Sequence, residues 1–395
     1  MGSNMLKFFL LIFTCISLPA TAANVIDETI SIGEASRIFL DSKVLGEKRN
    51  LLVHLPDDYT GSNKHYPVLY LVDGGRHFNH AIVATQLLEK QQRVPELIIV
   101  AISNNDAMDH EPEPKHGMKK FSLFVKNEVM TYVDKNYRTT GLNTLFGHTR
   151  AGWFTVELLA SHPELFKNYI SASAPLQYDE VNIYNKILVN SKATKSQQKS
   201  LYLALANEAQ ETKLYTDAFN NFVKLLTENP PKNLDWHSEF LANNTHMTTS
   251  LPALYNGLIH VFNSYLSPRF ASYEEYMAFG GMYGIETHYK ERAQIYGTDK
   301  RIPEKTLLNL ASMLLSKAKT EAALQVYSTL IINFPDSASS FSGLGQVYNS
   351  MKLYDKSIEA HKKAIRLADK LNPQWQQKRF QSRLDRVNET VQLLN

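Results

Sequence analysis

The sequence predicts an α/β fold, in which a mostly parallel sheet carries helices on both faces, followed by a smaller all-α segment. Two patterns in the chain indicate this class. In the first two thirds, short apolar runs typical of strands buried on both faces alternate with helical stretches. Beyond Leu307 the chain is helical and repeats itself. Because 395 residues exceed one ordinary core, two domains are expected.

The composition excludes several classes of protein. A hydrophobic content of 44% and a charged content of 21% are typical of a globular protein. The net charge of +3 is small, and no basic stripe is interleaved with aromatic residues. We therefore expect no nucleic-acid partner.

The N-terminus has the pattern of a secretory signal peptide. Lys7 precedes the apolar run Phe8–Leu18, and Pro19–Ala22 supplies an A-x-A cleavage pattern. The run is too short to span a bilayer, so we expect cleavage near Ala22, a secreted or periplasmic protein and no membrane span. The only cysteine, Cys15, lies in the removed part. Cysteine nucleophiles, disulfides and Cys-based zinc sites are thus excluded from the mature chain.

The strands of the first domain can be placed from apolar patterning. Ala35–Asp41 and Arg49–Leu55 alternate apolar and polar residues, which predicts an antiparallel pair at a sheet edge. A helix is expected over Phe121–Tyr137. The remaining strands are expected at Pro67–Val72, Leu97–Ile102, Thr144–Gly147, Tyr169–Ala174, Leu201–Ala206 and Trp236–Leu241. Right-handed crossovers place the loops that follow parallel strands along one edge, where ligands bind.

One of these strand-to-helix turns has the pattern of a nucleophile elbow. An apolar run enters Gly147-His148-Thr149-Arg150-Ala151-Gly152, and the amphipathic stretch Trp153–His162 leaves it. Strand, tight turn and helix form the context that the elbow of an α/β-hydrolase requires, with small residues beside the nucleophile. The central residue is Thr149 rather than serine. The pattern predicts that Thr149 is the nucleophile.

A hydroxyl nucleophile needs a histidine base, which follows it in the chain of an α/β-hydrolase. His246 lies in a polar loop after the strand Trp236–Leu241 and before a helix. The competitors are less well placed: His237 lies within the strand, His260 within the following apolar helix, and His148 beside the nucleophile. The sequence favours His246.

The acid that orients the histidine is expected after the strand Leu201–Ala206. Glu208 is the first carboxylate in that loop and is our choice, with Glu211 and Asp235 as alternatives.

The donors for the oxyanion are expected to be backbone amides. They are the amide of Arg150, which follows the nucleophile, and that of Gly75 or Arg76, in the loop after Pro67–Val72. No metal ligand or cofactor-binding residue is predicted.

Several further stretches resemble one family. The resemblance lies in Tyr66–Phe78, Ala101–Asp106, Asn136–Thr139, Gly147–Gly152, His162–Phe166, Ser171–Asp179, Ala206–Glu208 and His246–Phe262. In them the chain resembles the esterase family of α/β-hydrolases that includes bacterial siderophore esterases and the esterase D group. It looks most like secreted members with a C-terminal tetratricopeptide segment. The resemblance implies cleavage of carboxylic esters through an acyl-enzyme, without metal or cofactor, although the family's serine is Thr149 here.

The helical segment has the spacing of a tetratricopeptide repeat (TPR), with a period of about 34 residues. The matching positions are Leu307, Leu310, Ala311, Leu314, Ala323, Tyr327, Leu330 and Pro335, and then Phe341, Leu344, Gly345, Tyr348, Ser357, His361 and Ala364. An ordinary helical hairpin bundle is the alternative. The predicted organisation is a signal peptide at 1–22, an esterase domain at 23–263, a connector at 264–303 and a TPR-like domain at 304–395.

These observations predict a secreted carboxylic ester hydrolase acting on a small-molecule ester. The alternative is a catalytically impaired homologue that binds a peptide or protein partner through the TPR segment and acts as a scaffold. The loop Ser103–His116 and the connector Ser264–Arg301 are candidates for walls of the substrate pocket. They could equally pack the two domains together.

Overall fold

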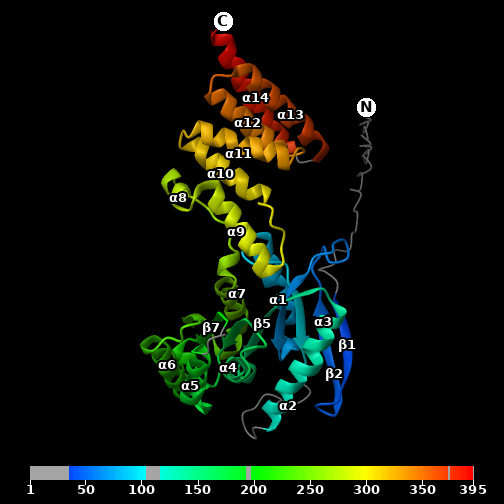
Figure 1. The fold of residues 1–395 in the computed structure, drawn as a ribbon, viewed down its shortest axis with the longest axis vertical. Coiled ribbons are helices and arrows are strands. Elements are labelled where there is room, and N and C mark those ends of the chain that lie inside the picture. Colours follow the sequence, from blue (N-terminus) through cyan, green and yellow to red (C-terminus); the bar gives the residue numbers. More distant parts are fainter. Residues whose placement is uncertain (1–34, 104–115, 193–196, 372–373, 395) are drawn as a thin grey trace, which may run out of the picture. The chain divides into compact units, whose positions relative to one another are not determined.

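The computed structural model describes residues 35–103, 116–192, 197–371 and 374–394 (Figure 1). The predicted signal peptide and most of the loop between Ser103 and His116 lie outside these ranges. Among the helices that the structure describes, none has the length and apolar character needed to cross a membrane.

In the part of the chain that the structure describes, one eight-stranded sheet organises the residues before the connector, in the order β1-β2-β4-β3-β5-β6-β7-β8. The edge strands β1 and β2 run antiparallel to each other, and β2 runs antiparallel to β4. All other neighbours are parallel. The strands are β1 (Ala35–Ser42), β2 (Glu47–His54), β3 (Tyr66–Val72), β4 (Ile98–Ile102), β5 (Thr139–His148), β6 (Asn168–Ala172), β7 (Lys199–Ala206) and β8 (Leu234–Leu241).

The predicted mostly parallel sheet and its antiparallel edge pair are therefore confirmed. The strand leading into the elbow is longer than predicted. It begins at Thr139 rather than Thr144, because polar residues at its start lie at the less buried end of the sheet, where the apolar pattern is absent.

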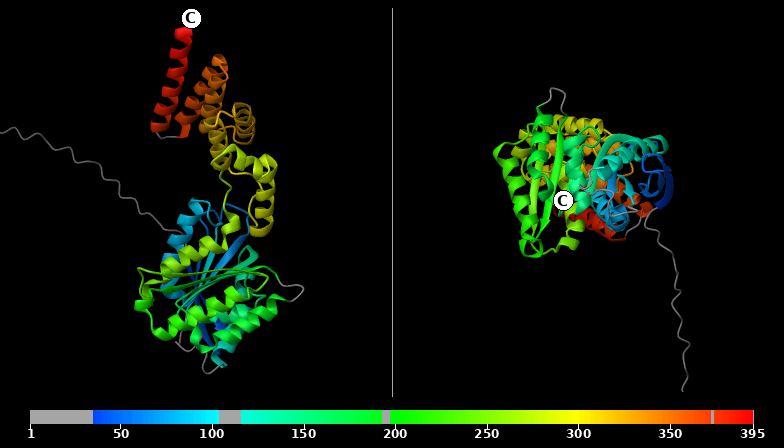
Figure 2. Two further views of the ribbon diagram at one scale, coloured as in Figure 1. Left: turned by 90° about the vertical axis from the view of Figure 1, so that its left-hand side faces the viewer. Right: turned by 90° about the horizontal axis from the view of Figure 1, so that it is seen from below.

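Helices cover both faces of the sheet, as Figure 2 shows. They are α1 (Gly74–Lys90), α2 (His116–Phe124), the π-helix η1 (Val125–Met130), α3 (Thr131–Asn136), α4 (Arg150–Ser161), α5 (Glu180–Ser191), α6 (Lys213–Glu228) and α7 (Ser250–Val261). The single helix expected over Phe121–Tyr137 is thus a run of three helical pieces with a π-helical turn in the middle.

The alternation of side chains along the strands divides the core into two layers. Val68, Tyr70 and Val72 of β3 pack with side chains from α2 to α6, whereas Leu69 and Leu71 pack with α1 and α7. Every residue of β3 and β4 is buried, which explains the continuous hydrophobic runs of these two strands in the sequence. Helices packed on both faces of the sheet hold the strands in place, and with them the strand ends from which the polar loops leave.

The connector holds two helices, α8 (Tyr273–Ala278) and α9 (Gly281–Tyr296). At the end of α9, a Cβ on Gly297 would lie 2.4 Å from the Thr140 side chain and 3.5 Å from the His65 carbonyl oxygen. Thr140 and His65 stand at the amino ends of β5 and β3, opposite the loops expected to carry chemistry. This end of the connector packs against the sheet. It does not form the wall of a substrate pocket beside Thr149, which was one of the two roles predicted for the connector.

Among the described residues after the connector, the structure has five helices: α10 (Glu304–Ser316), α11 (Thr320–Asn333), α12 (Ala338–Ser350), α13 (Tyr354–Leu371) and α14 (Gln374–Leu394). Each packs against the next, as antiparallel hairpins do. Most of the apolar repeat positions are buried, among them Leu307, Leu314 and Tyr327. Close approaches also occur at small residues, since a Cβ on Gly345 would lie 2.8 Å from the His361 ring. The C-terminal part is helical as predicted.

Candidate active site

The elbow is a strained turn between β5 and α4. Thr149 has φ 58° and ψ −123°, a conformation that a β-branched residue rarely adopts. Its amide donates to the Ala172 carbonyl on the neighbouring strand (2.8 Å), and its own carbonyl accepts from the Trp153 amide (3.0 Å). A Cβ on Gly147 would lie 2.0 Å from the Ala151 carbonyl oxygen, so only glycine fits there. The tight turn holds the Thr149 hydroxyl at the carboxyl end of the sheet.

His246 lies opposite that hydroxyl. It begins the short helix η4 (His246–Thr248), which follows β8 and is held by reciprocal hydrogen bonds between Thr245 and Thr248. The Thr149 hydroxyl lies 2.5 Å from Nε2 of His246 and can donate to it. A nucleophile and a base within hydrogen-bond reach are the first requirement of a catalytic triad. The structure brings these two sequence-predicted residues together.

The acid beside His246 is Glu211, not Glu208. Oε2 of Glu211 accepts from Nδ1 of His246 at 2.8 Å, and the Glu211 side chain is only 3% exposed. Glu208 is exposed in the single turn η3 (Glu208–Gln210). The Asn207 side chain caps this turn by accepting from the Ala209 amide, and it also donates to the Ala242 carbonyl (2.6 Å). These bonds hold the turn with Glu208 on the exposed side. The chain then becomes extended at Glu211, whose side chain reaches His246.

The other candidates from the sequence lie elsewhere. Asp235 is at the amino end of β8, half-exposed, with a carboxylate oxygen 3.9 Å from Nε2 of His260 on α7. The ring of His237 stacks on Tyr202, with centroids 5.9 Å apart. Asp235 thus lies at the end of the sheet opposite Thr149, and His237 lies in the middle of β8.

Two buried hydroxyls that the sequence reasoning missed support the acid and the base. Ser173 donates to Oε1 of Glu211 (2.8 Å), and the Thr249 hydroxyl donates to the His246 carbonyl (2.8 Å). The two hydroxyls lie 3.0 Å apart and both residues are fully buried. Ser173 is the residue immediately after β6 and has φ 44°. A search for polar residues at the end of each predicted strand would have found this position.

His148 positions the backbone of the histidine loop. Its Nε2 donates to the His246 carbonyl oxygen (2.7 Å), which identifies the protonated nitrogen of its ring. Burial lowers the pKa of His148 to about 4 and that of its neighbour His77 to about 3. The two rings meet edge to face at 5.7 Å. Both histidines are therefore neutral near pH 7, and neither adds a charge beside His246.

The expected oxyanion donors lie at the starts of two helices. Arg150 is the first residue of α4, and Gly75 and Arg76 are in the first turn of α1. Amides in a first turn have no acceptor four residues earlier within the helix. The Arg76 amide already donates to the Asp73 carbonyl oxygen (3.3 Å). This geometry favours Gly75 over Arg76 as a donor.

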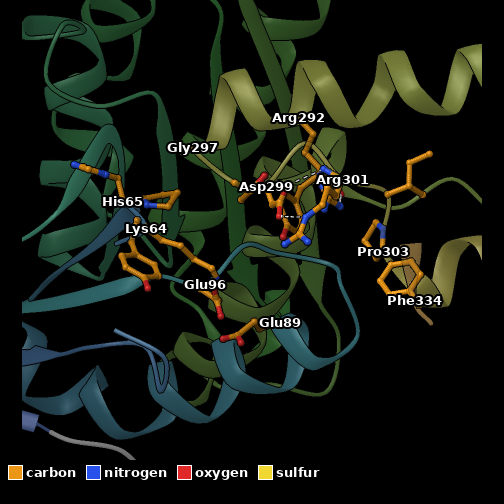
Figure 3. Close-up of a pocket in the computed structure, with 15 residues that line it drawn as sticks. Lys64, His65, Glu89, Glu96, Arg292, Gly297, Asp299, Arg301, Pro303 and Phe334 are labelled. Atoms are coloured by element: carbon orange, nitrogen blue, oxygen red, sulfur yellow. Dashed lines mark hydrogen bonds and ion pairs between the residues drawn. The ribbon is translucent and has the colours of Figure 1, made fainter. Parts of the chain in front are cut away.

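A pocket of about 360 Å³ lies far from these residues (Figure 3). It is lined by the start of β3, by α1 and by the connector, including Glu89, Arg292 and the ion pair between Arg301 and Asp299. Burial raises the pKa of Glu89 to about 7. None of the residues around His246 lines it.

Among the described residues, no group of three or more His, Cys, Asp or Glu side chains is placed to hold a metal ion.

The fold and this site define an α/β-hydrolase. The chain belongs to the family described as "Putative esterase", whose model matches residues 42–249. The predicted family is thus confirmed.

Relatives and solved structures agree with this assignment. The chain is 24% identical over 172 residues to the ferri-bacillibactin esterase BesA of Bacillus subtilis, a match that covers 36% of this chain and 58% of that protein. The chain spans little more than half the length of the curated relatives it matches. An IroE-like serine hydrolase from Shewanella oneidensis is 25% identical with a TM-score of 0.59, covering 76% of this chain and 100% of that chain.

A further structure extends the likeness into the helical part. An uncharacterised protein from Capnocytophaga ochracea, 15% identical, has a TM-score of 0.61 and covers 90% of this chain and 100% of that chain. At this identity the likeness shows the fold alone.

Proposed function

We propose that the protein is a secreted carboxylic ester hydrolase that uses Thr149 as nucleophile, His246 as base and Glu211 as the orienting acid. The observation that carries the proposal is the continuous contact from the Thr149 hydroxyl through both ring nitrogens of His246 to the buried Glu211 carboxylate. Nucleophile, base and orienting group in this order are the parts of a Ser-His-Asp triad, with threonine and glutamate as variants.

The contacts define a balanced reaction. The Thr149 oxygen forms a bond to the ester carbonyl carbon while Nε2 of His246 takes the hydroxyl proton. The negative charge on the carbonyl oxygen would be stabilised by the amides of Arg150 and Gly75. When the carbon–oxygen bond to the alcohol breaks, His246 returns the proton to the leaving oxygen. In the second half, His246 deprotonates water, which cleaves the acyl-enzyme, and Thr149 regains its proton as the acid leaves.

The methyl group of Thr149 is the main constraint on the rate. A β-branched side chain has a restricted χ1, and Thr149 already has the strained backbone of the elbow. A displacement of the attacking oxygen by about 1 Å can cost on the order of 10²-fold in rate. We therefore expect slow turnover, mainly of esters rather than amides, as the name of the family and that of the Bacillus subtilis relative suggest.

Hydrolysis of p-nitrophenyl acetate by three forms tests the proposal: the chain as given, Thr149→Ser and His246→Ala. We expect activity in the given form, an increase of about 10- to 100-fold in kcat with serine, and a loss of more than about 10³-fold without the histidine. Activity only in Thr149→Ser would mean that one methyl group blocks an intact site. If all three folded forms are inactive, the esterase proposal is wrong.

The second candidate is a catalytically impaired homologue that acts as a scaffold and binds a peptide or protein through a TPR-like helical segment. The threonine at the nucleophile position favours it, as does the burial of the repeat positions Leu307, Leu314 and Tyr327. Inactivity of the chain as given, with retention of a partner by residues 304–395, would support this function.

A further inference from the structure

The pocket of about 360 Å³ in Figure 3 is lined by charged side chains of both signs. Among the described residues that line it, three are Lys or Arg and three are Asp or Glu: Lys64, Arg292, Arg301, Glu89, Glu96 and Asp299. Four of these charges are paired, because Lys64 lies 2.9 Å from Glu96 and Arg301 lies 2.6 Å from Asp299. The two charges that stay without an ion pair are those of Arg292 and Glu89.

Arg292, on α9, is a buried cation. It is only 6% exposed, and its Nη1 donates to the Tyr265 carbonyl oxygen (3.3 Å) and the Ser267 hydroxyl (3.5 Å), whereas its Nε has no acceptor. In the part of the chain that the structure describes, no carboxylate lies within ion-pair distance of it. The rings of Tyr265 and Tyr289, each 4.3 Å from the guanidinium carbon, compensate only part of its charge. Because buried charges in proteins are normally paired, Arg292 indicates an anionic ligand.

Glu89, on α1, is the corresponding anion. It is half-buried, and Figure 3 shows it on the other side of the pocket from α9. The ammonium group of Lys64 is engaged by Asp58 and Glu96, and no Lys or Arg among the described residues lies within ion-pair distance of Glu89. Burial raises the pKa of Glu89 to about 7, and the carboxylates of Glu96, Asp57 and Asp58 contribute to the rise. A cationic group beside Glu89 would therefore be stabilised.

The pocket also has an apolar wall. Ile302, Pro303 and Phe334 line it and are half-buried, and Figure 3 shows Pro303 and Phe334 beyond Arg301 on the connector side. A volume of about 360 Å³ lies in the range of small-molecule sites. The pocket thus offers one group for an anion, one group for a cation, and an apolar surface.

We propose that this pocket binds a small zwitterion, an α-amino acid with an apolar side chain. Its carboxylate binds the Arg292 guanidinium, its ammonium group donates to the Glu89 carboxylate, and its side chain lies against Pro303 and Phe334. The pocket includes the amino end of β3, whereas Thr149 follows the carboxyl end of the parallel strand β5. The amino acid therefore does not compete with an ester at Thr149, and its binding does not require the proposed hydrolase activity.

Three ligands that share one side chain and differ in their charged groups test the proposal. They are L-leucine, 4-methylpentanoate, which lacks the ammonium group, and 3-methylbutylamine, which lacks the carboxylate. In calorimetric titrations of the chain as given at pH 7.5, we expect a Kd for leucine below about 1 mM and binding of either analogue that is about 10-fold weaker or more. Absence of leucine binding at about 10 mM would overturn the proposal. Equal affinities for leucine and one analogue would overturn it as well, because two charges would then not be recognised together.

Two variants locate the binding. Glu89→Gln keeps the size of the side chain and removes its charge, and Arg292→Lys keeps the charge but removes the planar fork that matches a carboxylate. Each should weaken leucine binding by about 10-fold. Glu321→Gln, at an exposed position of α11, is the matched control and should leave the affinity unchanged. Leucine binding that survives both pocket variants would place the ligand elsewhere and contradict the assignment.

Thermal melts distinguish a ligand-binding group from a structural one. Above pH 7 the folded chain ionises Glu89 against its raised pKa of about 7, whereas the unfolded chain has the ordinary value of 4.5. Ionised Glu89 therefore destabilises the fold, and Glu89→Gln without ligand should keep or raise Tm at pH 8. With about 10 mM leucine, Tm should rise by about 2 °C in the chain as given and by less in Glu89→Gln. A lower Tm of Glu89→Gln without ligand, together with an equal rise on adding leucine, would make Glu89 a structural residue and refute the site.

Discussion

The carboxylate of Glu211 and the ring of His246 meet at 2.8 Å, and the second carboxylate oxygen accepts a hydrogen bond from the buried Ser173 hydroxyl. The carboxylate is therefore held from both sides, by a loop after β6 and a loop after β8. Such a fixed acceptor sets which nitrogen of His246 carries its proton and leaves Nε2 to accept from Thr149.

Glu211→Gln should lower kcat/KM for p-nitrophenyl acetate by about 10²- to 10⁴-fold, because an amide in place of the carboxylate no longer stabilises the protonated imidazole. Steady-state kinetics on the purified variant measures the loss. Glu208→Gln, three residues earlier and exposed, is the control and should remain within about two-fold. A larger loss of kcat/KM in Glu208→Gln than in Glu211→Gln would mean that Glu208 is the carboxylate that orients His246.

His148→Leu should lower kcat by about 10-fold with little change in KM, because the His246 carbonyl loses one of its two donors and the loop that carries the base is held less firmly. His148→Gln, which can still donate, should recover part of the loss. Comparison of kcat and KM for both variants checks this. An equal loss in both variants would mean that ring packing, rather than the hydrogen bond, is what matters.

Much of this architecture follows from local patterns in the sequence. Buried parallel strands need continuous apolar runs, and the elbow needs small residues around Thr149, so both leave a signature in the order of residues. His246 is similarly marked by its loop between a strand and a helix. The structure brings Thr149 and His246 together because both loops leave carboxyl ends of parallel strands.

The sequence could not identify which carboxylate orients His246. Glu208 and Glu211 lie in one loop, and which of them turns inward depends on a single 3-10 turn whose cap, Asn207, bonds to the distant Ala242. Ser173 and Thr249 act through contacts between loops far apart in the chain. No local periodicity records such contacts, and only the folded sheet edge reveals them.

Gly147→Ala should destabilise the fold by about 3 kcal/mol or more, because the added Cβ would lie 2.0 Å from a backbone oxygen that cannot move without unwinding α4. Chemical denaturation followed by circular dichroism measures the change. Gly75→Ala is the matched control: a Cβ there meets nothing within 4 Å, so its unfolding free energy should stay within about 1 kcal/mol. Similar stabilities for both variants would argue against the tight elbow.

Low pH should destabilise the protein, because His77 and His148 are buried in their neutral form. Burial lowers the pKa of His77 to about 3 and that of His148 to about 4 from an ordinary value of 6.5. Below pH 6.5 the unfolded chain therefore binds protons at these rings that the folded chain does not. The free energy of unfolding falls as the pH drops from 6.5 towards 4.

Thermal melts at pH 7.5 and pH 5 check this, and we expect Tm to fall by about 5 °C or more. His148→Gln should reduce the fall, whereas His162→Gln, at a half-exposed surface position, should leave it unchanged. A fall that His148→Gln does not reduce would assign the acid sensitivity to other groups.

Removal of the C-terminal helices should leave the hydrolase active with the same range of substrates. In the described part of the chain, the two core layers of the sheet contain no residue beyond Tyr296. The connector meets the sheet at the amino ends of β3 and β5, away from Thr149. A chain ending at Pro303 would however expose Ile285 and Tyr289, which are buried against α10 and α11, and the Tyr289 hydroxyl would lose its 2.7 Å contact with Thr306.

We therefore expect the chain ending at Pro303 to retain kcat/KM for p-nitrophenyl esters within about three-fold but to aggregate at lower concentration, because an apolar patch becomes exposed. The same truncation with Ile285→Gln should be less prone to aggregation and equally active. Light scattering and steady-state kinetics separate the two effects. A changed order of preference among acetate, octanoate and aryl esters would show that the helices control access to the site, and loss of the far-ultraviolet signal of the sheet would show that they are required for its folding.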